Sequence, residues 1–123
     1  MRDPFKKLMS NVKLSAKHGS RGARGQKALN PEYKERKIDF DSIYLKQLFE
    51  QQEYKCHWLD IPLDPKWIFK SWHPLAISVD RMDCEKGYTK DNIVICCRLV
   101  NLGRCRYDEV EFTGVMDYIK ANL

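Results

Sequence analysis

Three polar side chains, Asp80, Asn92 and Asn101, stand at the ends of short apolar segments. Asp80 ends the alternating segment "AISVD", Asn92 opens the apolar segment "NIVIC", and Asn101 follows Asn92 by nine residues. If the two segments pair and a helix packs across them, Asp80 and Asn101 can offer oxygen atoms to one cation. Oxygen ligands are those that Mg²⁺ prefers. We therefore expect a divalent metal site where the first segment ends.

The elements that must position these residues are two strands and a helix. Alternation in "AISVD" and the continuous apolar run in "NIVIC" both predict strands. The turn between them contains Gly87, for which we expect a positive backbone φ because the turn is tight. A helix that begins near Cys97 would carry Asn101 on its first or second turn. The segment thus predicts a ββα unit.

Further helices are predicted on both sides of this unit. Asp3 and Pro4 read as an N-cap followed by proline at the first helical position, which predicts a helix to Lys17. Asp41 caps a second predicted helix that ends near Gln52, and Asp108 with Glu111 opens a last one. The segment "YKCHWLDIPLDP" predicts a strand and a turn. The expected apolar residues are Phe5, Leu8, Met9, Val12 and Ala16 in the first helix and Val110, Val115, Met116 and Ile119 in the last.

The positive charge of the chain lies at its N-terminal end. Residues 1–38 hold eleven Lys or Arg and three Asp or Glu, a net charge of +8, whereas residues 39–123 carry −3. Such an arm suits a polyanion, because lysines and arginines that neutralise phosphates release counterions; a solvated, solubilising surface is the alternative reading. We expect a basic N-terminal helix and connector over residues 1–40, with residues 18–37 mobile until a partner binds, and a second domain over 41–123.

Composition also limits the compartment. The sequence contains no apolar run long enough to span a membrane and no apolar centre of a signal peptide near Met1. Five cysteines, an odd number, fit a reducing environment better than a disulfide framework. We therefore expect an intracellular protein of the cytoplasm, nucleoid or nucleus, not a secreted one and not one that binds membranes.

The pattern around Asp80 resembles the HNH-type ββα-metal nucleases. Their motif has Asp-His at a strand end, an Asn opening the next strand and a His nine residues later; here the matching positions are Asp80-Arg81, Asn92 and Asn101. The likeness covers about residues 41–112, and Arg104 stands where the family often has a Lys. The resemblance implies an α+β fold with an HNH-like core, additional flanking helices and a basic N-terminal arm, in which Asp80 and Asn101 bind one Mg²⁺ or Mn²⁺ and the Asn92 amide ties the turn.

The general base departs from that family, because Arg81 occupies the place of its His. An arginine cannot accept a proton from water near neutral pH, so Arg81 is better suited to orienting a phosphate. His73, Asp83 and Tyr88, ranked in this order, are the candidate bases, and loss of activity is the alternative. His73 stands just before the first segment and is of the residue type that most often serves as a base, and Asp83 stands three residues after Asp80.

The spacing of the cysteines indicates whether the chain can bind the structural zinc that many HNH proteins hold. A structural zinc needs four ligands, usually from two Cys-x-x-Cys pairs. Here Leu59 and Val100 stand where the partners of Cys56 and Cys97 would be. We therefore expect no structural zinc, with Cys56 and Cys97 buried and facing each other.

The expected function is metal-dependent hydrolysis of DNA phosphodiester bonds by a monomer or homodimer. The alternatives are a DNA-binding module of the same fold that has lost catalysis, and an RNA-binding or RNA-cleaving protein. Aromatic residues of "WLDIPLDPKWIFKSW" either stack on unpaired bases or cover the core. The residues expected to contact nucleic acid are Arg21, Arg24, Lys27, Lys34, Arg36, Lys37, Tyr88, Lys90 and Arg104.

Overall fold

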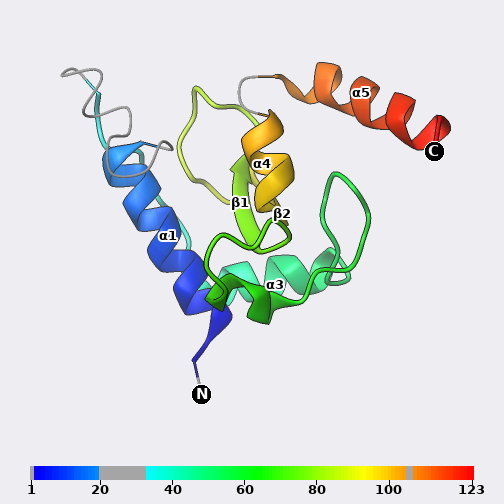
Figure 1. The fold of residues 1–123 in the computed structure, drawn as a ribbon. Coiled ribbons are helices and arrows are strands. Elements are labelled where there is room, and N and C mark those ends of the chain that lie inside the picture. The colour runs from blue at the N-terminus through cyan, green and yellow to red at the C-terminus, as the bar shows by residue number, and fades with distance from the viewer. Residues whose placement is uncertain (1, 20–32, 105–106) are drawn as a thin grey trace.

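The computed structural model describes residues 2–19, 33–104 and 107–123. Its centre is an antiparallel hairpin of β1 (Ile77–Arg81) and β2 (Ile93–Cys97), followed directly by α4 (Arg98–Arg104), which packs on both strands (Figure 1). The two strands and the helix that follows them were predicted from the sequence and are confirmed. The chain has a mixed α+β fold, as predicted.

Helices α1 (Pro4–His18) and α3 (Ser42–Gln51) pack against each other and against the hairpin. Asp3 and Asp41 cap them through side-chain oxygens, as the sequence predicted. All five expected apolar residues of α1 are buried in the same core as the strands. Residues 2–18 are therefore packed into one body with the hairpin.

The two faces of β1 have different neighbours because side chains alternate along a strand. Ser78 and Asp80 face α4, to which both are hydrogen-bonded, so Ile77 and Val79 point to the opposite side, where α1 packs. The outer edge of β2 is closed by Gln52, whose amide both donates to and accepts from the backbone of Ile95. This short sheet is therefore covered on both faces and along one edge.

Two local predictions were wrong. The segment "YKCHWLDIPLDP" forms no strand; Lys55 and Pro62 make only an isolated bridge, and the short 3-10 helix η2 (Pro65–Phe69) follows. Gly87 does not have a positive φ; the only described glycine that does is Gly19. A Cβ at Gly87 would lie 2.8 Å from the Lys37 carbonyl oxygen, so the position requires glycine because two backbone segments approach closely.

The last helix, α5 (Glu109–Ala121), lies away from the body of the molecule (Figure 1). Its cap, Asp108, was predicted correctly, but its buried side was not. Phe112 is buried and Met116 packs partly against the core, whereas Val110 is 82% exposed. Val115 and Ile119, also expected on the apolar side, are exposed too.

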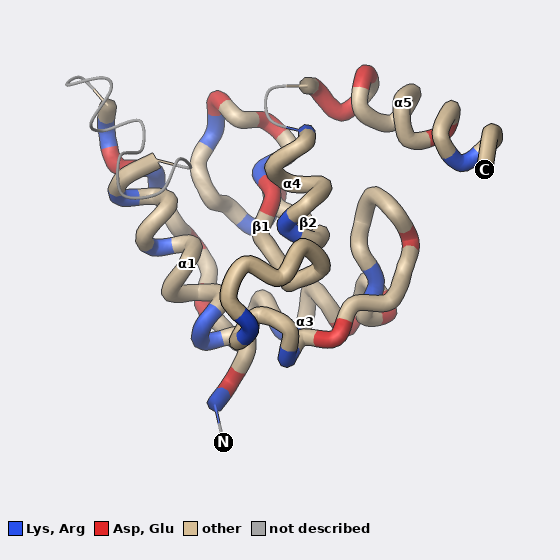
Figure 2. The backbone as a smooth tube through the Cα atoms, in the orientation of Figure 1, with Lys and Arg blue, Asp and Glu red and all other residues tan. Residues whose placement is uncertain are grey.

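Charge is distributed unevenly over these elements. Figure 2 shows Lys and Arg along α1 and Asp and Glu at the start of α5. The lysines of α1 are exposed: Lys6, Lys7, Lys13 and Lys17. Within the described ranges, no helix combines the length and the apolar character that a membrane crossing requires.

Candidate functional site

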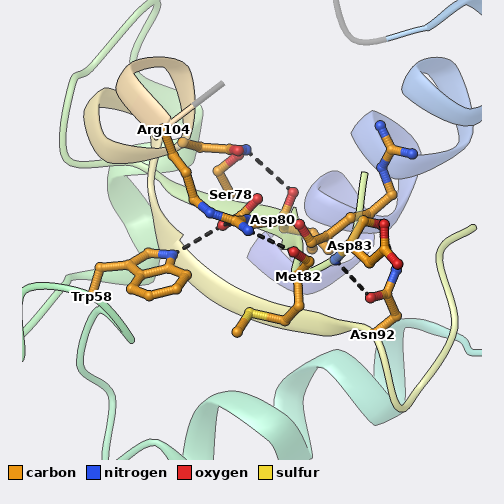
Figure 3. A network of polar contacts seen from close by, with 10 residues as sticks. Trp58, Ser78, Asp80, Met82, Asp83, Asn92 and Arg104 are labelled. Carbon is orange, nitrogen blue, oxygen red and sulfur yellow. Dashed lines mark hydrogen bonds and ion pairs between the residues drawn. The ribbon is translucent and has the colours of Figure 1, made fainter. Parts of the chain in front are cut away.

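Asp80 is a buried carboxylate with two strong hydrogen-bond donors. Its Oδ2 accepts a hydrogen bond from the indole Nε1 of Trp58 at 2.9 Å and one from Nη1 of Arg104 at 2.7 Å (Figure 3). Burial raises the pKa of the Asp80 carboxyl, and these two donors oppose that rise because they stabilise the charged form. The carboxylate is therefore held in one orientation by contacts to one of its oxygens.

Arg104 is not placed to contact nucleic acid, which corrects our expectation for this residue. It is 3% exposed, and its terminal nitrogens also donate to the carbonyl oxygens of Arg81 and Met82 at 2.7 and 2.6 Å. The guanidinium lies 5.1 Å from the centre of the Trp58 ring. Arg104 thus joins the end of α4 to the end of β1 around the Asp80 charge.

Asn101 contacts β1 on the face that carries Asp80, at Ser78, two residues before Asp80. Its Nδ2 donates to Ser78 Oγ at 2.7 Å and to the Val79 carbonyl at 3.2 Å. Asn101 and Arg104 are three residues apart on α4, so they lie on one side of that helix and pair with Ser78 and Asp80 in order. The crossing helix therefore brings Asn101 beside the strand end that carries Asp80.

Each of these two residues keeps one oxygen available. Among the described residues, neither Oδ1 of Asp80 nor Oδ1 of Asn101 has a hydrogen-bond partner. Neither oxygen is fully buried, so solvent can reach both. A carboxylate with one oxygen fixed by the protein and the other open is the usual arrangement of an oriented metal ligand. Mg²⁺ accepts two such oxygens because it keeps several waters and binds substrate phosphate directly.

The cavity beside Arg104 is acidic. It has a volume of about 360 Å³, and its lining includes Arg104, Asp83, Asp108 and Glu109 but neither Asp80 nor Asn101. Three carboxylates and one guanidinium give this lining a net negative charge, which repels a phosphodiester and attracts cations. The local charge is therefore compatible with a divalent ion as an intermediary.

His57 is the imidazole that the structure brings to this site. Its ring packs edge-on against Trp58 at 4.8 Å, and its backbone N–H donates to Ile95 of β2. Burial lowers the pKa of His57 below 6.5, while the charges of Glu109 and Asp80 act in the opposite direction and Arg104 acts with burial. At neutral pH the imidazole is uncharged and able to accept a proton. His57 was not among the bases predicted from the sequence, because only the packing of Trp58 against Asp80 brings it here.

The three bases expected from the sequence lie elsewhere or are occupied. His73 precedes β1, at the end opposite to Asp80; its Nδ1 accepts from the Leu75 backbone and its ring stacks on Trp67 at 4.8 Å. Asp83 lies in the turn after β1, lines the acidic cavity and accepts from Glu85 N. Tyr88 is 4% exposed, and burial raises its pKa, which disfavours both proton abstraction and contact with a phosphate.

The turn between the strands is held by Asn92 and Arg81. The Asn92 amide accepts from Asp83 N and donates to the carbonyls of Asp83 and Gly87 (2.9, 3.0 and 3.0 Å), which are the turn-tying contacts expected of it (Figure 3). Nη1 of Arg81 donates to the carbonyls of Cys84 and Lys86, and its guanidinium lies 5.2 Å from the centre of the Tyr88 ring. Both side chains therefore fix the shape of the turn.

The remaining basic residues fall into three groups. Lys34, Lys37 and Lys90 are exposed, so their ammonium groups can reach a phosphate. Arg36 is half-buried, and its Nη1 donates to the Glu85 carbonyl, which ties the connector to the turn. Outside the described residues are the other three: Arg21, Arg24 and Lys27.

Cys56 and Cys97 are buried and face each other, as predicted. The Cys97 thiol and backbone N–H groups hydrogen-bond to the Cys56 sulfur and hold its pKa below its ordinary value, whereas the pKa of Cys97 is raised. In the described part of the chain, no group of three or more His, Cys, Asp or Glu side chains is placed to bind a metal. A site whose only protein ligands are Asp80 and Asn101 has fewer ligands than such a group.

Comparison of the chain with protein-family models, with curated proteins and with solved structures finds no match.

Proposed function

We propose that this chain is a metal-dependent endonuclease that hydrolyses DNA phosphodiester bonds, with the HNH-like core that its sequence resembles. The observation that carries the proposal is the pairing of α4 with β1, which brings Asn101 to the face of β1 that carries Asp80, each residue with an oxygen free. This pairing of residues 21 positions apart in the sequence supports a cation shared by their two oxygens.

The residues fit Mg²⁺ or Mn²⁺ held weakly. Asp80 and Asn101 would supply two oxygens, and water and substrate phosphate would supply the others. The Arg104 guanidinium, 2.7 Å from the other oxygen of Asp80, offsets part of the carboxylate charge, so we expect metal to bind tightly only when DNA adds its own negative charge. When bound, the metal stabilises negative charge on the phosphate under attack and on the departing oxygen.

The protein's own groups have separate tasks in this proposal. Trp58 and Arg104 hold Asp80 in place, which a catalytic site requires because misplaced groups lose rate steeply. His57, uncharged at neutral pH, would take the proton of the attacking water. Arg81 points to the face of β1 opposite to Asp80 and is hydrogen-bonded within the turn, so it has no part in orienting the phosphate. The exposed lysines of α1 hold the DNA backbone.

Incubation of supercoiled plasmid with the protein and Mg²⁺, Mn²⁺ or EDTA tests the proposal. We expect nicked circles with either metal, none with EDTA, and none from Asp80→Ala or Asn101→Ala. Lys46→Ala, which removes an exposed charge on α3 outside this site, is the matched control and should still nick. Wild-type protein that leaves the plasmid intact under all metals would overturn the proposal.

The Asp80–Arg104 ion pair also favours a second candidate, a DNA-binding module without catalysis. In such a protein the guanidinium would neutralise Asp80 permanently, and the pair would serve only to join α4 to β1. Binding of plasmid fragments without nicking, unchanged by metal and by Asn101→Ala, would favour this candidate over the endonuclease.

A further inference from the structure

Trp72 is the most exposed large aromatic side chain in the described residues. It is 78% exposed, whereas Trp58 is buried and Trp67 is half-buried. A tryptophan left in water forgoes the burial that normally stabilises a small domain through its large side chains. The ring of Trp72 is therefore not part of the core.

The backbone at Trp72 is in the left-handed region, with φ of 56°. Lys70 to His73 form a turn in which His73 N donates to the Lys70 carbonyl at 3.4 Å, and Trp72 occupies the third position. A turn with positive φ at its third position normally has Gly or Asn there, because a Cβ is disfavoured. The chain thus holds a bulky side chain outward at a position where its backbone is strained, a combination that favours a role in binding.

One basic group lies over the ring. The Arg98 guanidinium lies 5.1 Å from the centre of the Trp72 ring, and Lys70 and Lys66 nearby in sequence are exposed. An aromatic face next to cationic side chains is the arrangement with which proteins bind single-stranded nucleic acid, since the ring stacks on a base and the charges contact its phosphates. A duplex offers no free base face to such a ring.

We propose that Trp72 and Arg98 form a stacking platform for an unpaired base, so that the substrate is DNA with a single-stranded or opened segment. This inference rests on the proposed function and names its substrate class. Arg98 begins α4 and Asn101 follows it by three residues, so one helix carries a residue of the platform and a residue of the candidate metal site.

Binding measured in EDTA tests this inference without cleavage. The probes are a labelled single strand of about 12 nucleotides and the matching duplex, followed by fluorescence anisotropy. Trp72→Gly should weaken binding of the single strand by about 5- to 150-fold and leave duplex binding nearly unchanged. Trp72→Phe should retain most of the affinity, and Leu99→Ala, which shortens a neighbouring exposed side chain on α4, should not change it.

The same variant also provides the control for correct folding, because glycine relieves the strained backbone at position 72. The thermal midpoint of Trp72→Gly should therefore equal or exceed that of the wild-type protein. Equal loss of single-strand and duplex binding, or no loss of either, would overturn the inference. So would a wild-type dimer that becomes monomeric in Trp72→Gly, since Trp72 would then bind a second copy. A protein that never nicks plasmid can still pass this test, so the two proposals fail separately.

Discussion

The Arg104 guanidinium lies 2.7 Å from the carboxylate of Asp80, and both side chains are almost completely buried. The two residues are 24 positions apart. They meet because α4 follows the hairpin and runs along β1 in the same direction as that strand. A buried ion pair needs further hydrogen bonds to offset the loss of water, and Trp58 and two backbone carbonyls supply them. This pair fixes the end of the strand on which the candidate metal site depends.

Removal of one partner of this pair should destabilise the protein strongly. Arg104→Met leaves the Asp80 charge buried without its cation and two carbonyls without donors, so we expect the free energy of unfolding to fall by about 3–5 kcal/mol. Arg104→Lys should recover only part of this, because an ammonium cannot bridge three acceptors with the planar geometry of a guanidinium. Urea unfolding measures both changes, with Lys46→Met as an exposed control. A loss for Arg104→Met no larger than that of the control would contradict the account.

Substitution of glycines should have opposite effects at two positions. In Gly87→Ala the new Cβ meets the Lys37 carbonyl oxygen at 2.8 Å, so we expect a loss of about 1–3 kcal/mol. At Gly103 an added Cβ would have no neighbouring atom within 4 Å, and the residue is helical, so Ala there should gain about 0.5–1 kcal/mol. Thermal unfolding of the two variants side by side checks the sign. Equal changes would mean that residues 37 and 87 are not in close contact.

The pKa of the His57 imidazole should be set by burial and by the charged groups near it. Because burial lowers its pKa below 6.5, folding favours the neutral ring. Its contribution to stability is therefore full above pH 6.5 and is lost as the pH falls through the lowered pKa. Glu109→Gln removes the largest charge that opposes this shift and should lower the pKa further. Two-dimensional NMR of the imidazole measures both values; a pKa above 6.5 in the wild-type protein would exclude this environment.

The base role of His57 gives a separate kinetic expectation. The nicking rate should rise with pH through the lowered pKa of His57 and then level off, since the neutral ring accepts the proton. His57→Gln should lower the rate by about 10²- to 10⁴-fold and abolish that rise. His73→Gln is the matched control, because His73 lies at the other end of β1. A larger loss from His73→Gln would return the base to the residue that the sequence suggested first.

DNA affinity should depend on salt through the lysines of α1. Each phosphate contact contributes about 0.9 to the slope of log affinity against log salt, so Lys13→Gln with Lys17→Gln should reduce the slope by about 1.8. Lys46→Gln with Lys120→Gln removes two exposed charges from other helices and should leave it unchanged. Equal slopes for both double variants would show that the charge of α1 serves solubility alone.

Much of the fold was predictable because its signals are local. Caps at Asp3, Asp41 and Asp108, the alternation of β1 and the apolar run of β2 each act within a few residues. The role of Asn92 in the turn was implied by the resemblance to the HNH-type nucleases, and its contacts agree with it. The exposed side of α5 was not, since a helix pattern does not show whether another element is present to cover it.

The site was less predictable because it depends on contacts between distant segments. Arg104 looked like a surface residue, and its burial becomes visible only when α4 is laid along β1 beside Trp58. The place of His57 depends on the same packing. His73 ranked first as a base because it is a histidine just before the first strand, but that strand puts His73 and Asp80 at its opposite ends.

The most direct test of the account is where a divalent ion binds. Mn²⁺ added in small amounts to the labelled protein with a short DNA broadens the NMR signals of nearby amides. We predict selective broadening at Ser78, Asp80 and Asn101 that Asp80→Asn abolishes while the fold, followed by the other amide signals, persists. Broadening centred elsewhere, or the same pattern in Asp80→Asn, would contradict a shared cation at Asp80 and Asn101.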